Sequence, residues 1–386
     1  MTSILEIIRR RFGSVQPIPS GIYHYIAPPH AEFPYRLHLR VEPDGSGLLI
    51  INAATVLHLN QTAAEYAYHL VQSTDPELAI RQIASRYQAP KSQIQRDFND
   101  FRERILTLIN MPDLDPVTYL DFDRQTPYAE QITAPYRLDC ALTYNLPAGS
   151  DPEAAPHRRV ERELALDEWQ HILDQAWQAG IPHVVFTGGE PTLRPDLFEL
   201  IQHAETLGQV TGLLTDGLKL TDPDYLHAIL QTGLDHLMII LNPDEPQSWT
   251  AIEKILPEDI YTTVHLTLTP GNAGQAESLV ERLDDIGASS LSLSATRADL
   301  EPALQDARQR AADLDMVLEW DLPVPYSQLN PVALELDEEQ QPQGAGRAWL
   351  YVEPDGDVLP AQGINRGLGN FLKQSWQEIW KQAQEE

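Results

Sequence analysis

Short apolar runs alternate with longer amphipathic segments from about Ala134 to Trp320, with a period of roughly thirty residues. Such alternation predicts strands that each lead into a helix, and therefore a parallel sheet. We expect an α/β fold, either an open barrel or a doubly wound sheet, and both bind ligands at the carboxyl ends of their strands. The predicted strands are Leu138–Tyr144, His183–Thr187, Val210–Thr215, His236–Leu241, Tyr261–Leu268 and Ser290–Ser294, and the helices should end at Gly180, Gly208, Gly233 and Gly287.

A different pattern precedes this region, up to about residue 125. Tyr35–Val41 alternates in polarity, Pro43-Asp44-Gly45 supplies a turn and Leu48–Asn52 returns, which predicts a hairpin. Helical patterns then cover Thr62–Gln72, a segment that starts at Asp75-Pro76, and about residues 92–109. A hairpin followed by three helices indicates a winged-helix-like α+β domain.

The last segment, about residues 323–386, begins with an acidic, Gln-rich loop at Glu335–Gln343. Trp349–Val352 and Val358-Leu359 flank a turn at residues 353–357, which predicts a second hairpin. A final helix is expected near Ser375–Gln384. We therefore predict three domains, formed by residues 1–125, 126–322 and 323–386.

Composition narrows the class of protein. The chain has 386 residues, of which 42% are hydrophobic, enough for a sizeable core. No apolar run approaches the ~18 residues that a membrane span needs. In Met1–Phe12 the basic residues follow the apolar ones, opposite to the order in a secretory signal. We expect a cytoplasmic protein that does not bind membranes.

The charge of the chain argues against nucleic acid as a partner. Its formal net charge is −30, from 27 Lys and Arg against 57 Asp and Glu, and such a surface repels phosphate backbones. The predicted helical region at residues 56–109 contains six residues of each sign, so it has no basic face for DNA. The acidic excess either serves solubility or attracts a basic peptide or partner.

The strongest candidate chemistry lies where the strand around Val185 runs into Gly188-Gly189-Glu190-Pro191. Two glycines at a strand end let the backbone approach a ligand closely, and Glu190 offers a carboxylate to an ammonium group. The string continues as Thr192-Leu193-Arg194-Pro195-Asp196-Leu197 and resembles radical S-adenosylmethionine (SAM) enzymes, in which this motif binds the methionyl amine. The resemblance implies a partial (β/α) TIM-like barrel of radical SAM type.

Later segments resemble the same family. Thr215-Asp216-Gly217 is similar to the family's Thr-Asn-Gly, with Asp in place of Asn, and Ile240-Leu241-Asn242 to its Ser-Leu-Asp, without the Ser. The resemblance thus implies SAM binding by Gly188, Gly189, Glu190, Pro191, Thr215, Asp216 and Asn242. Gly344-Ala345-Gly346-Arg347, residues 351–357 and Leu368-Gly369-Asn370 resemble the SPASM extension, which binds auxiliary clusters in the family.

The family holds an iron–sulfur cluster with three cysteines spaced C-x3-C-x2-C, whereas this chain has one cysteine, Cys140. If Cys140 were the first ligand, the other two positions would be Tyr144 and Pro147. The family's Leu-Thr-Tyr-x-Cys, which matches residues 142–146, instead places the ligand positions at Leu146, Ser150 and Glu153. We favour this second register, in which Cys140 is an inward strand residue.

The C-terminal segment lacks cluster ligands too. Gln343 and Ala361 stand where the SPASM resemblance would place cysteines. Because thiolates bind such clusters and neither register offers more than one sulfur, no iron–sulfur cluster is expected. No catalytic residue is assigned, because SAM homolysis needs a reductant that this chain cannot supply alone.

Residues 1–125 resemble the small family of pyrroloquinoline-quinone biosynthesis protein D (PqqD), a recognition element of peptide-modifying systems. The resemblance rests on Ile50-Ile51-Asn52, on residues 57–64 opening a helix and on Ala79–Tyr87 as a second helix. In that family a leader peptide adds as a strand to the sheet edge, which uses unpaired backbone groups. The alternative is a capping domain without a ligand.

Two other groups could carry chemistry. His265, with Glu190, Asp216 and Asn242, could form a divalent-metal site, but a strand histidine is more often a hydrogen-bonded core residue, and no metal site is predicted. His157-Arg158-Arg159 is expected to form a solvated loop.

The hypothesis that follows is a pseudoenzyme of the radical SAM superfamily. It would bind a precursor peptide, a catalytically active radical SAM homologue, or both, as an accessory or regulatory subunit. Three alternatives stay open: an enzyme that uses SAM or a related nucleotide without a cluster, a radical SAM enzyme whose cluster ligands come from a partner, and an interaction protein in which the motif is a relic.

Overall fold

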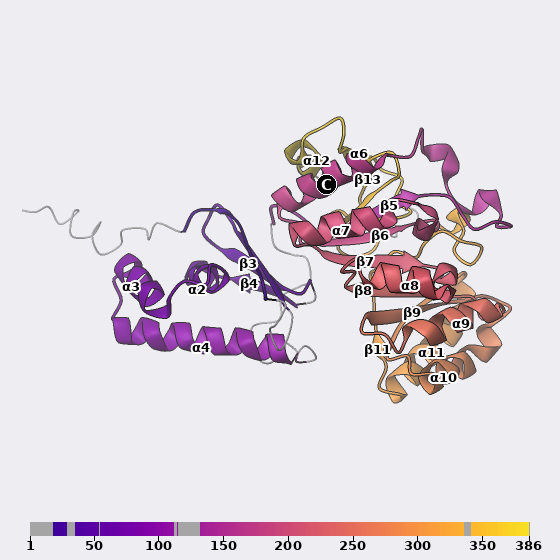
Figure 1. Ribbon diagram of the computed structural model, residues 1–386, viewed down its shortest axis with the longest axis horizontal. Helices are drawn as coiled ribbons and strands as arrows, with labels where there is room; N and C mark the ends of the chain where they lie inside the picture. Colours follow the sequence, from indigo (N-terminus) through magenta and orange to yellow (C-terminus); the bar gives the residue numbers. More distant parts are fainter. Residues whose placement is uncertain are drawn as a thin grey trace, which may run out of the picture. The chain divides into compact units, whose positions relative to one another are not determined.

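The computed structural model describes residues 18–28, 35–53, 55–111, 114, 132–335 and 341–385. The chain divides into two compact units, residues 1–126 and 127–386 (Figure 1). Met1–Phe12 and residues 336–340 of the predicted acidic loop lie outside the described residues. The boundaries of the three predicted domains stay predictions.

The N-terminal unit contains an antiparallel sheet of four described strands in the order β1-β2-β3-β4. The predicted hairpin is present as β2 and β3, in which Leu39 pairs with Leu49. Helix α2 begins after Asn60, whose side chain accepts a hydrogen bond from the Ala63 N–H. The elements are β1 (Gly21–Ile26), β2 (Arg36–Val41), β3 (Gly47–Ile51), β4 (Thr55–Leu59), α2 (Gln61–Val71), α3 (Pro76–Tyr87) and α4 (Lys91–Asn110).

Strands β1 and β4 differ from the prediction, which had only the central hairpin. The segment before the predicted helix forms strand β4 as far as Leu59, and Asn60 caps α2 as expected. Asn52 and Ala53 both have positive φ, 51° and 57°, and this short left-handed turn returns the chain along β3. Strand β4 therefore forms one edge of the described sheet.

The second unit is built on a parallel sheet whose described strands follow the order β11-β10-β9-β8-β7-β6-β5, continued by β12, β13 and β14. All six strands expected from the alternating pattern are present. They are β5 (Arg137–Thr143), β6 (His183–Gly188), β7 (Val210–Thr215), β8 (His236–Leu241), β9 (Tyr261–Leu268) and β10 (Ser290–Ala295), followed by β11 (Val317–Leu318).

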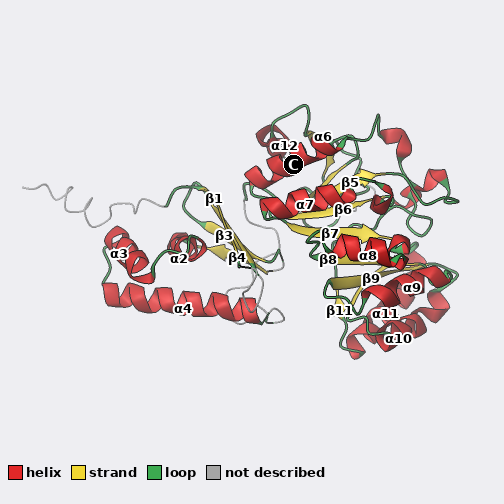
Figure 2. Cartoon of the chain, in the orientation of Figure 1, coloured by secondary structure: helices red, strands yellow, loops and turns green. Residues whose placement is uncertain are grey.

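Helices cover the outer face of this sheet, and their apolar sides form the main core with residues such as Leu138, Phe186 and Leu237 (Figure 2). Gly180 and Gly208 are left-handed caps of α6 and α7, as expected. The helices are α6 (Leu166–Ala179), α7 (Leu197–Leu207), α8 (Pro223–Leu230), α9 (Pro246–Ile255), α10 (Ala276–Asp285) and α11 (Glu301–Asp313).

The C-terminal segment extends the same sheet. Strand β12 (Trp349–Val352) pairs in parallel with β5, and its antiparallel partner β13 (Asp357–Leu359) completes the predicted hairpin. Strand β14 (Gly369–Asn370) and helix α12 (Trp376–Gln384) follow, the helix with the capping box Ser375/Glu378. Within the described residues, no helix has the length and apolar character that crossing a bilayer requires.

Candidate functional site

The Gly-Gly-Glu motif lies at the carboxyl end of β6, directly against the end of β5. Gly188 has a φ of 127°, and a Cβ there would lie 2.2 Å from the Thr143 carbonyl oxygen. A Cβ on Gly189 would lie 2.4 Å from the Asn145 carbonyl oxygen. Both glycines are therefore required by the close approach of β5 and β6, whether or not a ligand binds.

Glu190 is 3% exposed, and its carboxylate is saturated by hydrogen bonds from the protein. Oε1 accepts from the Thr192 N–H at 2.9 Å, from the Thr192 hydroxyl at 2.5 Å and from the Thr215 hydroxyl at 2.7 Å, while Oε2 accepts from the Asp216 N–H at 2.8 Å. This network joins the ends of β6 and β7. Glu190 thus has a structural role in addition to any contact with a ligand.

Asp216 stands beside Glu190 and titrates abnormally. Burial, then the neighbouring Glu190 carboxylate, raises the pKa of Asp216 to about 8. Asp216 with this pKa is mostly protonated at neutral pH, so the pair carries less negative charge than two ionised carboxylates. A cation placed between them would release that proton and restore the charge.

The two carboxyl groups line a cavity of about 290 Å³ together with Gly189, Asn242 and Glu245. The structure thus brings the motif residues from β6, β7 and β8 to one place, with Gly188, Pro191 and Thr215 directly behind them. Among the residues that the structure describes, no Lys, Arg or His lines this cavity. The remaining walls come from residues 146–150, Leu218, Ile240, Ser248 and residues 325–329.

Sequence reasoning missed the wall formed by Glu245 and residues 325–329. Glu245 precedes the Pro246 that starts α9, a helix-start signal that revealed nothing about the cavity. Residues 325–329 lie beyond the last parallel strand and were assigned to the C-terminal segment. The run Pro323-Val324-Pro325 was the available signal, because alternating prolines favour an extended chain.

The loop in which the family carries its cluster is folded against the barrel. Its residues 145–162 contain two short 3-10 helices, Pro152–Ala154 and His157–Arg159. Leu146 and Val160 pack against a buried group that includes Tyr144, Tyr326 and Tyr351. Aromatic and aliphatic side chains therefore fill the space behind this loop.

Arg159 ties the loop to the C-terminal segment, and its predicted solvation is wrong. Its guanidinium lies 2.7 Å from the Glu335 carboxylate and 3.2 Å from that of Glu353, and its side chain is only 25% exposed. It also donates to the Tyr326 hydroxyl at 3.2 Å. Arg158, in contrast, is 87% exposed and pairs with an equally solvated Glu153.

The residues present do not fit an iron–sulfur cluster. Cys140 is fully buried in the middle of β5 and belongs to the core that faces the helices. Burial raises the pKa of its thiol well above the usual value, so no thiolate is offered to a metal. Positions from both registers line the cavity, Pro147 of the first and Leu146 and Ser150 of the second, so the choice of register stays a prediction.

The fit to SAM is incomplete as well. The three carboxyl groups of Glu190, Asp216 and Glu245 suit the ammonium and sulfonium centres of that molecule. Its carboxylate would meet no cationic side chain, because none lines the cavity. Within the described part of the chain nothing cationic compensates the carboxylate, so we derive no reaction step through SAM.

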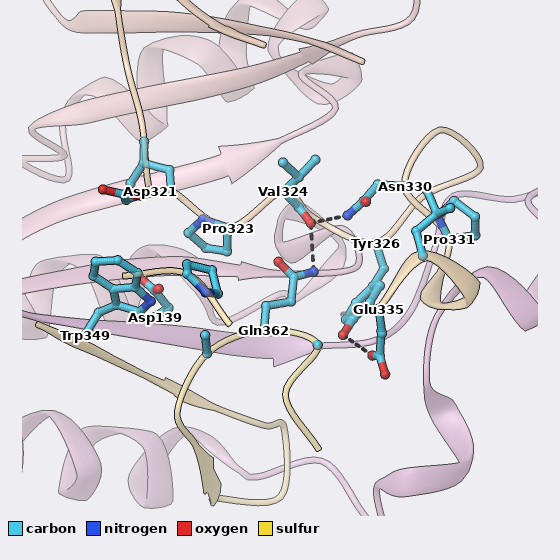
Figure 3. Close-up of a pocket in the computed structure, with 15 residues that line it drawn as sticks. Asp139, Asp321, Pro323, Val324, Tyr326, Asn330, Pro331, Glu335, Trp349 and Gln362 are labelled. Atoms are coloured by element: carbon cyan, nitrogen blue, oxygen red, sulfur yellow. Dashed lines mark hydrogen bonds between the residues drawn. The ribbon is translucent and has the colours of Figure 1, made fainter. Parts of the chain in front are cut away.

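A second cavity, of about 340 Å³, occupies the region of the SPASM resemblance (Figure 3). Ala361, where that resemblance places a cysteine, lines it together with Asp139, Trp349 and Gln362. Arg137 holds Asp139 with two hydrogen bonds, of 2.6 and 3.1 Å, and its guanidinium stacks 5.1 Å from the Trp349 ring. The described residues that line this cavity include no Cys or Met.

His265 lies away from the carboxyl cluster and is hydrogen-bonded in the barrel interior. Its Nδ1 lies 3.0 Å from the Ser292 hydroxyl, and its Nε2 lies 3.1 and 3.0 Å from those of Thr267 and Ser294. Burial lowers its pKa to about 4. Among the described residues, no group of three or more His, Cys, Asp or Glu side chains is arranged to hold a metal ion.

Comparison with known proteins finds the same superfamily that the sequence motifs resemble. The model of the radical SAM superfamily matches residues 140–243. A PqqA peptide cyclase of Streptomyces rochei is 30% identical over 283 residues, which cover 64% of this chain and 76% of the relative. A PqqA peptide cyclase of Ruegeria pomeroyi is 27% identical and covers similar shares of the two chains, 64% and 74%.

Solved structures show the same fold over nearly the whole chain. SuiB of Streptococcus suis bound to S-adenosylmethionine superposes with a TM-score of 0.59 at 15% identity, covering 92% of this chain and 88% of SuiB. SuiB bound to its precursor peptide SuiA gives a TM-score of 0.58 at 14% identity, with shares of 94% and 88%. The predicted partial barrel, with a small N-terminal sheet domain and a C-terminal extension, is confirmed.

Proposed function

The chain belongs to the radical SAM superfamily, and we propose that it is a non-catalytic member that binds a precursor peptide. It would act in the cytoplasm as an accessory or regulatory subunit of ribosomal-peptide modification, alone with the peptide or beside an active homologue. The two relatives named above are PqqA peptide cyclases, and one of the two SuiB structures contains a bound precursor peptide. The role of the present chain is inferred from its own residues.

The observation that carries this proposal is the packed loop at residues 145–162, at the place where the family carries its cluster. This loop is fixed by Arg159 and by a packed tyrosine group, and it contains no cysteine. Buried ion pairs form only when both partners are placed well, since an unpaired buried charge is costly. The scaffold is thus maintained without the means to hold a cluster.

Peptide binding is supported by a groove in the N-terminal unit. A cavity of about 450 Å³ lies beside the edge strand β4, between α2 and α4. Leu57, Tyr66 and Phe101 supply apolar walls, and Asp97 and Asp100 stand at its rim. An extended peptide added to β4 would gain main-chain hydrogen bonds there and place alternate side chains in the groove.

The first test is chemical. We expect near-zero iron and acid-labile sulfide after anaerobic reconstitution of the purified full chain, because one buried thiol cannot hold a cluster. Stoichiometric iron with a cluster spectrum would overturn the non-catalytic assignment. Iron that appears only when an active homologue is added would favour ligands supplied by a partner.

The second test is binding of precursor peptides encoded beside the gene, measured by calorimetry on the full chain. Phe101→Ala should weaken the binding at least ~5-fold, because it removes an apolar wall of the groove. Glu103→Ala is the matched control, since Glu103 is exposed on the same helix and does not line the groove. Failure of every such peptide to bind would reject the peptide-binding role.

A second candidate function, SAM or nucleotide binding without a cluster, is favoured by the retained cavity at Glu190. No cationic side chain among the described lining residues can pair with the carboxylate of SAM. We therefore expect weak binding of SAM itself, with a dissociation constant near or above millimolar. Calorimetric titration of the full chain with SAM checks this. Micromolar affinity would favour the alternative enzyme hypothesis over the accessory role.

A further inference from the structure

Residues 321–335 cross the inner face of the barrel sheet after β11. Arg137 Nη2 donates to the Asp321 carbonyl at 2.6 Å, and the Tyr326 N–H donates to the Gly188 carbonyl at 2.8 Å. Between these two bonds, Leu322 and Val324 pack against an apolar patch on the inner face of β6, β7 and β8. This inner patch consists of Val185, Leu214, Met238 and Ile240.

Side chains hold the segment in place more than its own backbone does. The Val324 carbonyl accepts from the side-chain amides of Asn330 at 2.6 Å and Gln362 at 2.8 Å, and Figure 3 shows both amides directed at it. The Tyr326 hydroxyl donates to Glu335 at 2.6 Å. Pro323 and Pro325 have no N–H, so the segment cannot join the sheet as a regular strand.

The segment resembles a bound peptide. Its apolar side chains at positions 322 and 324 face the inner patch, its prolines keep it extended and Tyr326 is 2% exposed against Tyr144. It forms part of the wall of the two cavities described above. Residues 322–324 and Tyr326 line the cavity at Asp139, and residues 325–329 line the one at Glu190. Tyr326 is common to the two.

We propose that residues 322–326 are an internal peptide ligand of the barrel. They occupy an inner surface that fits an extended peptide with apolar side chains two residues apart followed by an aromatic one. An external peptide that binds this inner patch would have to displace them. This inference goes beyond peptide binding at β4 and does not depend on it.

The segment also bears on the pseudoenzyme hypothesis, because it covers the inner patch of the barrel sheet. While Leu322 and Val324 cover the inner patch, an external peptide cannot occupy it. Because the segment makes few main-chain hydrogen bonds to the sheet, its release should cost less than the loss of a strand. Polar substitution of Leu322 and Val324 should therefore expose the inner patch without unfolding the barrel.

The single native cysteine makes a clean test possible. Met238→Cys, at a position that is 0% exposed under the segment, provides a reporter thiol, and Cys140 on the opposite face reports general unfolding. Thiol labelling of the full chain, resolved by mass spectrometry of the two peptides, is compared with and without Leu322→Ser plus Val324→Ser. The synthetic peptide DLPVPYSQ, which repeats residues 321–328, is the external probe.

We expect the double substitution to raise labelling of the reporter at least ~10-fold while Cys140 stays protected, and the peptide to slow it again. The peptide should not bind the chain with an intact segment. Unchanged labelling, or faster labelling that the peptide does not reverse, would overturn the proposal.

If Cys140 is labelled too, the double variant has unfolded, and Val324→Ala alone is measured instead. This milder change should still raise the labelling of the reporter, by ~3-fold. An unchanged rate in that variant would also overturn the proposal. Precursor-peptide binding by the same protein is read separately by calorimetry, so that failure of one inference is distinguishable from failure of the other.

Discussion

Glu190 has a structural role that does not depend on a ligand. The carboxylate accepts four hydrogen bonds, and two of them, from the Thr215 hydroxyl and the Asp216 N–H, come from the neighbouring strand. Truncating such a buried acceptor would leave those donors without partners, at ~1–3 kcal/mol for each group. The motif is therefore held by folding as well as by any ligand, and its presence alone does not prove SAM binding.

Asp216 makes a prediction about pH. In the folded chain its pKa is raised to about 8 by burial and by Glu190, from an ordinary value of 3.8. Between these two values the unfolded chain binds fewer protons than the folded one, so this residue makes stability fall as the pH rises from ~4 to ~8. Asp216→Asn removes the titrating group. We expect its stability relative to the parent to increase across that range, measured by urea unfolding at several pH values.

The control for this prediction is Asp285→Asn, an exposed carboxylate on α10. It should leave the pH dependence of unfolding unchanged. A parallel pH profile for Asp216→Asn and its parent would show that the pKa of Asp216 is not raised in the folded chain.

Arg158 and Arg159 give a matched pair of neighbouring cations. Arg159→Ala leaves Glu335 and Glu353 without their partner in a mostly buried setting, and we expect a loss of about 2–4 kcal/mol in unfolding free energy. Arg158→Ala breaks a solvated pair and should cost less than ~0.5 kcal/mol. Equal effects of the two substitutions would show that the loop is not anchored as described. Chemical denaturation of the full chain measures both.

At the scale of elements, the period of apolar residues predicted the parallel strands well. Leu237–Leu241 and Val184–Phe186 are continuous apolar runs buried on both faces, and such runs are clear signals in a sequence. Strand β4 was missed because Leu57-His58-Leu59 lies between a turn and a cap, where strand and helix entry look alike. The left-handed turn at Asn52 and Ala53 directs the chain into strand β4, and the residue types alone do not reveal this turn.

The candidate site was only partly predictable, for a related reason. Residues at strand ends of a parallel sheet converge by topology, so Glu190, Asp216 and Asn242 could be grouped from the sequence. Arg159 and Tyr326, which bond to each other beside the site, are 167 positions apart in the sequence. Arg159 and its ion-pair partner Glu335 are 176 positions apart. No local pattern encodes such partners.

Strands β6 and β8 make a second prediction about pH, through His183 and His236. Their Nε2 atoms lie 2.8 Å apart, so at least one ring must be neutral. Burial, followed by Arg137, lowers the pKa of His236 to about 4, and that of His183 is lowered as well. The unfolded chain therefore binds more protons below pH ~6.5, and stability should fall as the pH drops from there to ~4.

The test is urea unfolding of His236→Gln between pH 4 and 8. Glutamine can still bond to His183 but does not titrate, so the acid-side loss of stability should be smaller than in the parent. An identical acid-side slope in the two proteins would mean that other groups dominate the titration.

At the scale of the whole molecule, the net charge of −30 has a consequence for association. Residues 56–109 contain equal numbers of acidic and basic groups, so most of the excess lies outside the helices that flank the peptide groove. Its field would therefore act at a distance, on the rate of encounter more than on the contacts in the groove. Salt screens such a field within a Debye length of ~10 Å at 0.1 M.

The prediction is a difference between two versions of one groove-binding peptide. A version with lysines flanking its β4-binding stretch should associate at least ~10-fold more slowly at 0.5 M than at 0.05 M salt, with little change in dissociation rate. A version with glutamines at those positions should show almost no salt dependence. Stopped-flow fluorescence on the full chain measures both rates. If the two versions respond alike, the acidic surface does not steer a basic partner, and its role is confined to solubility.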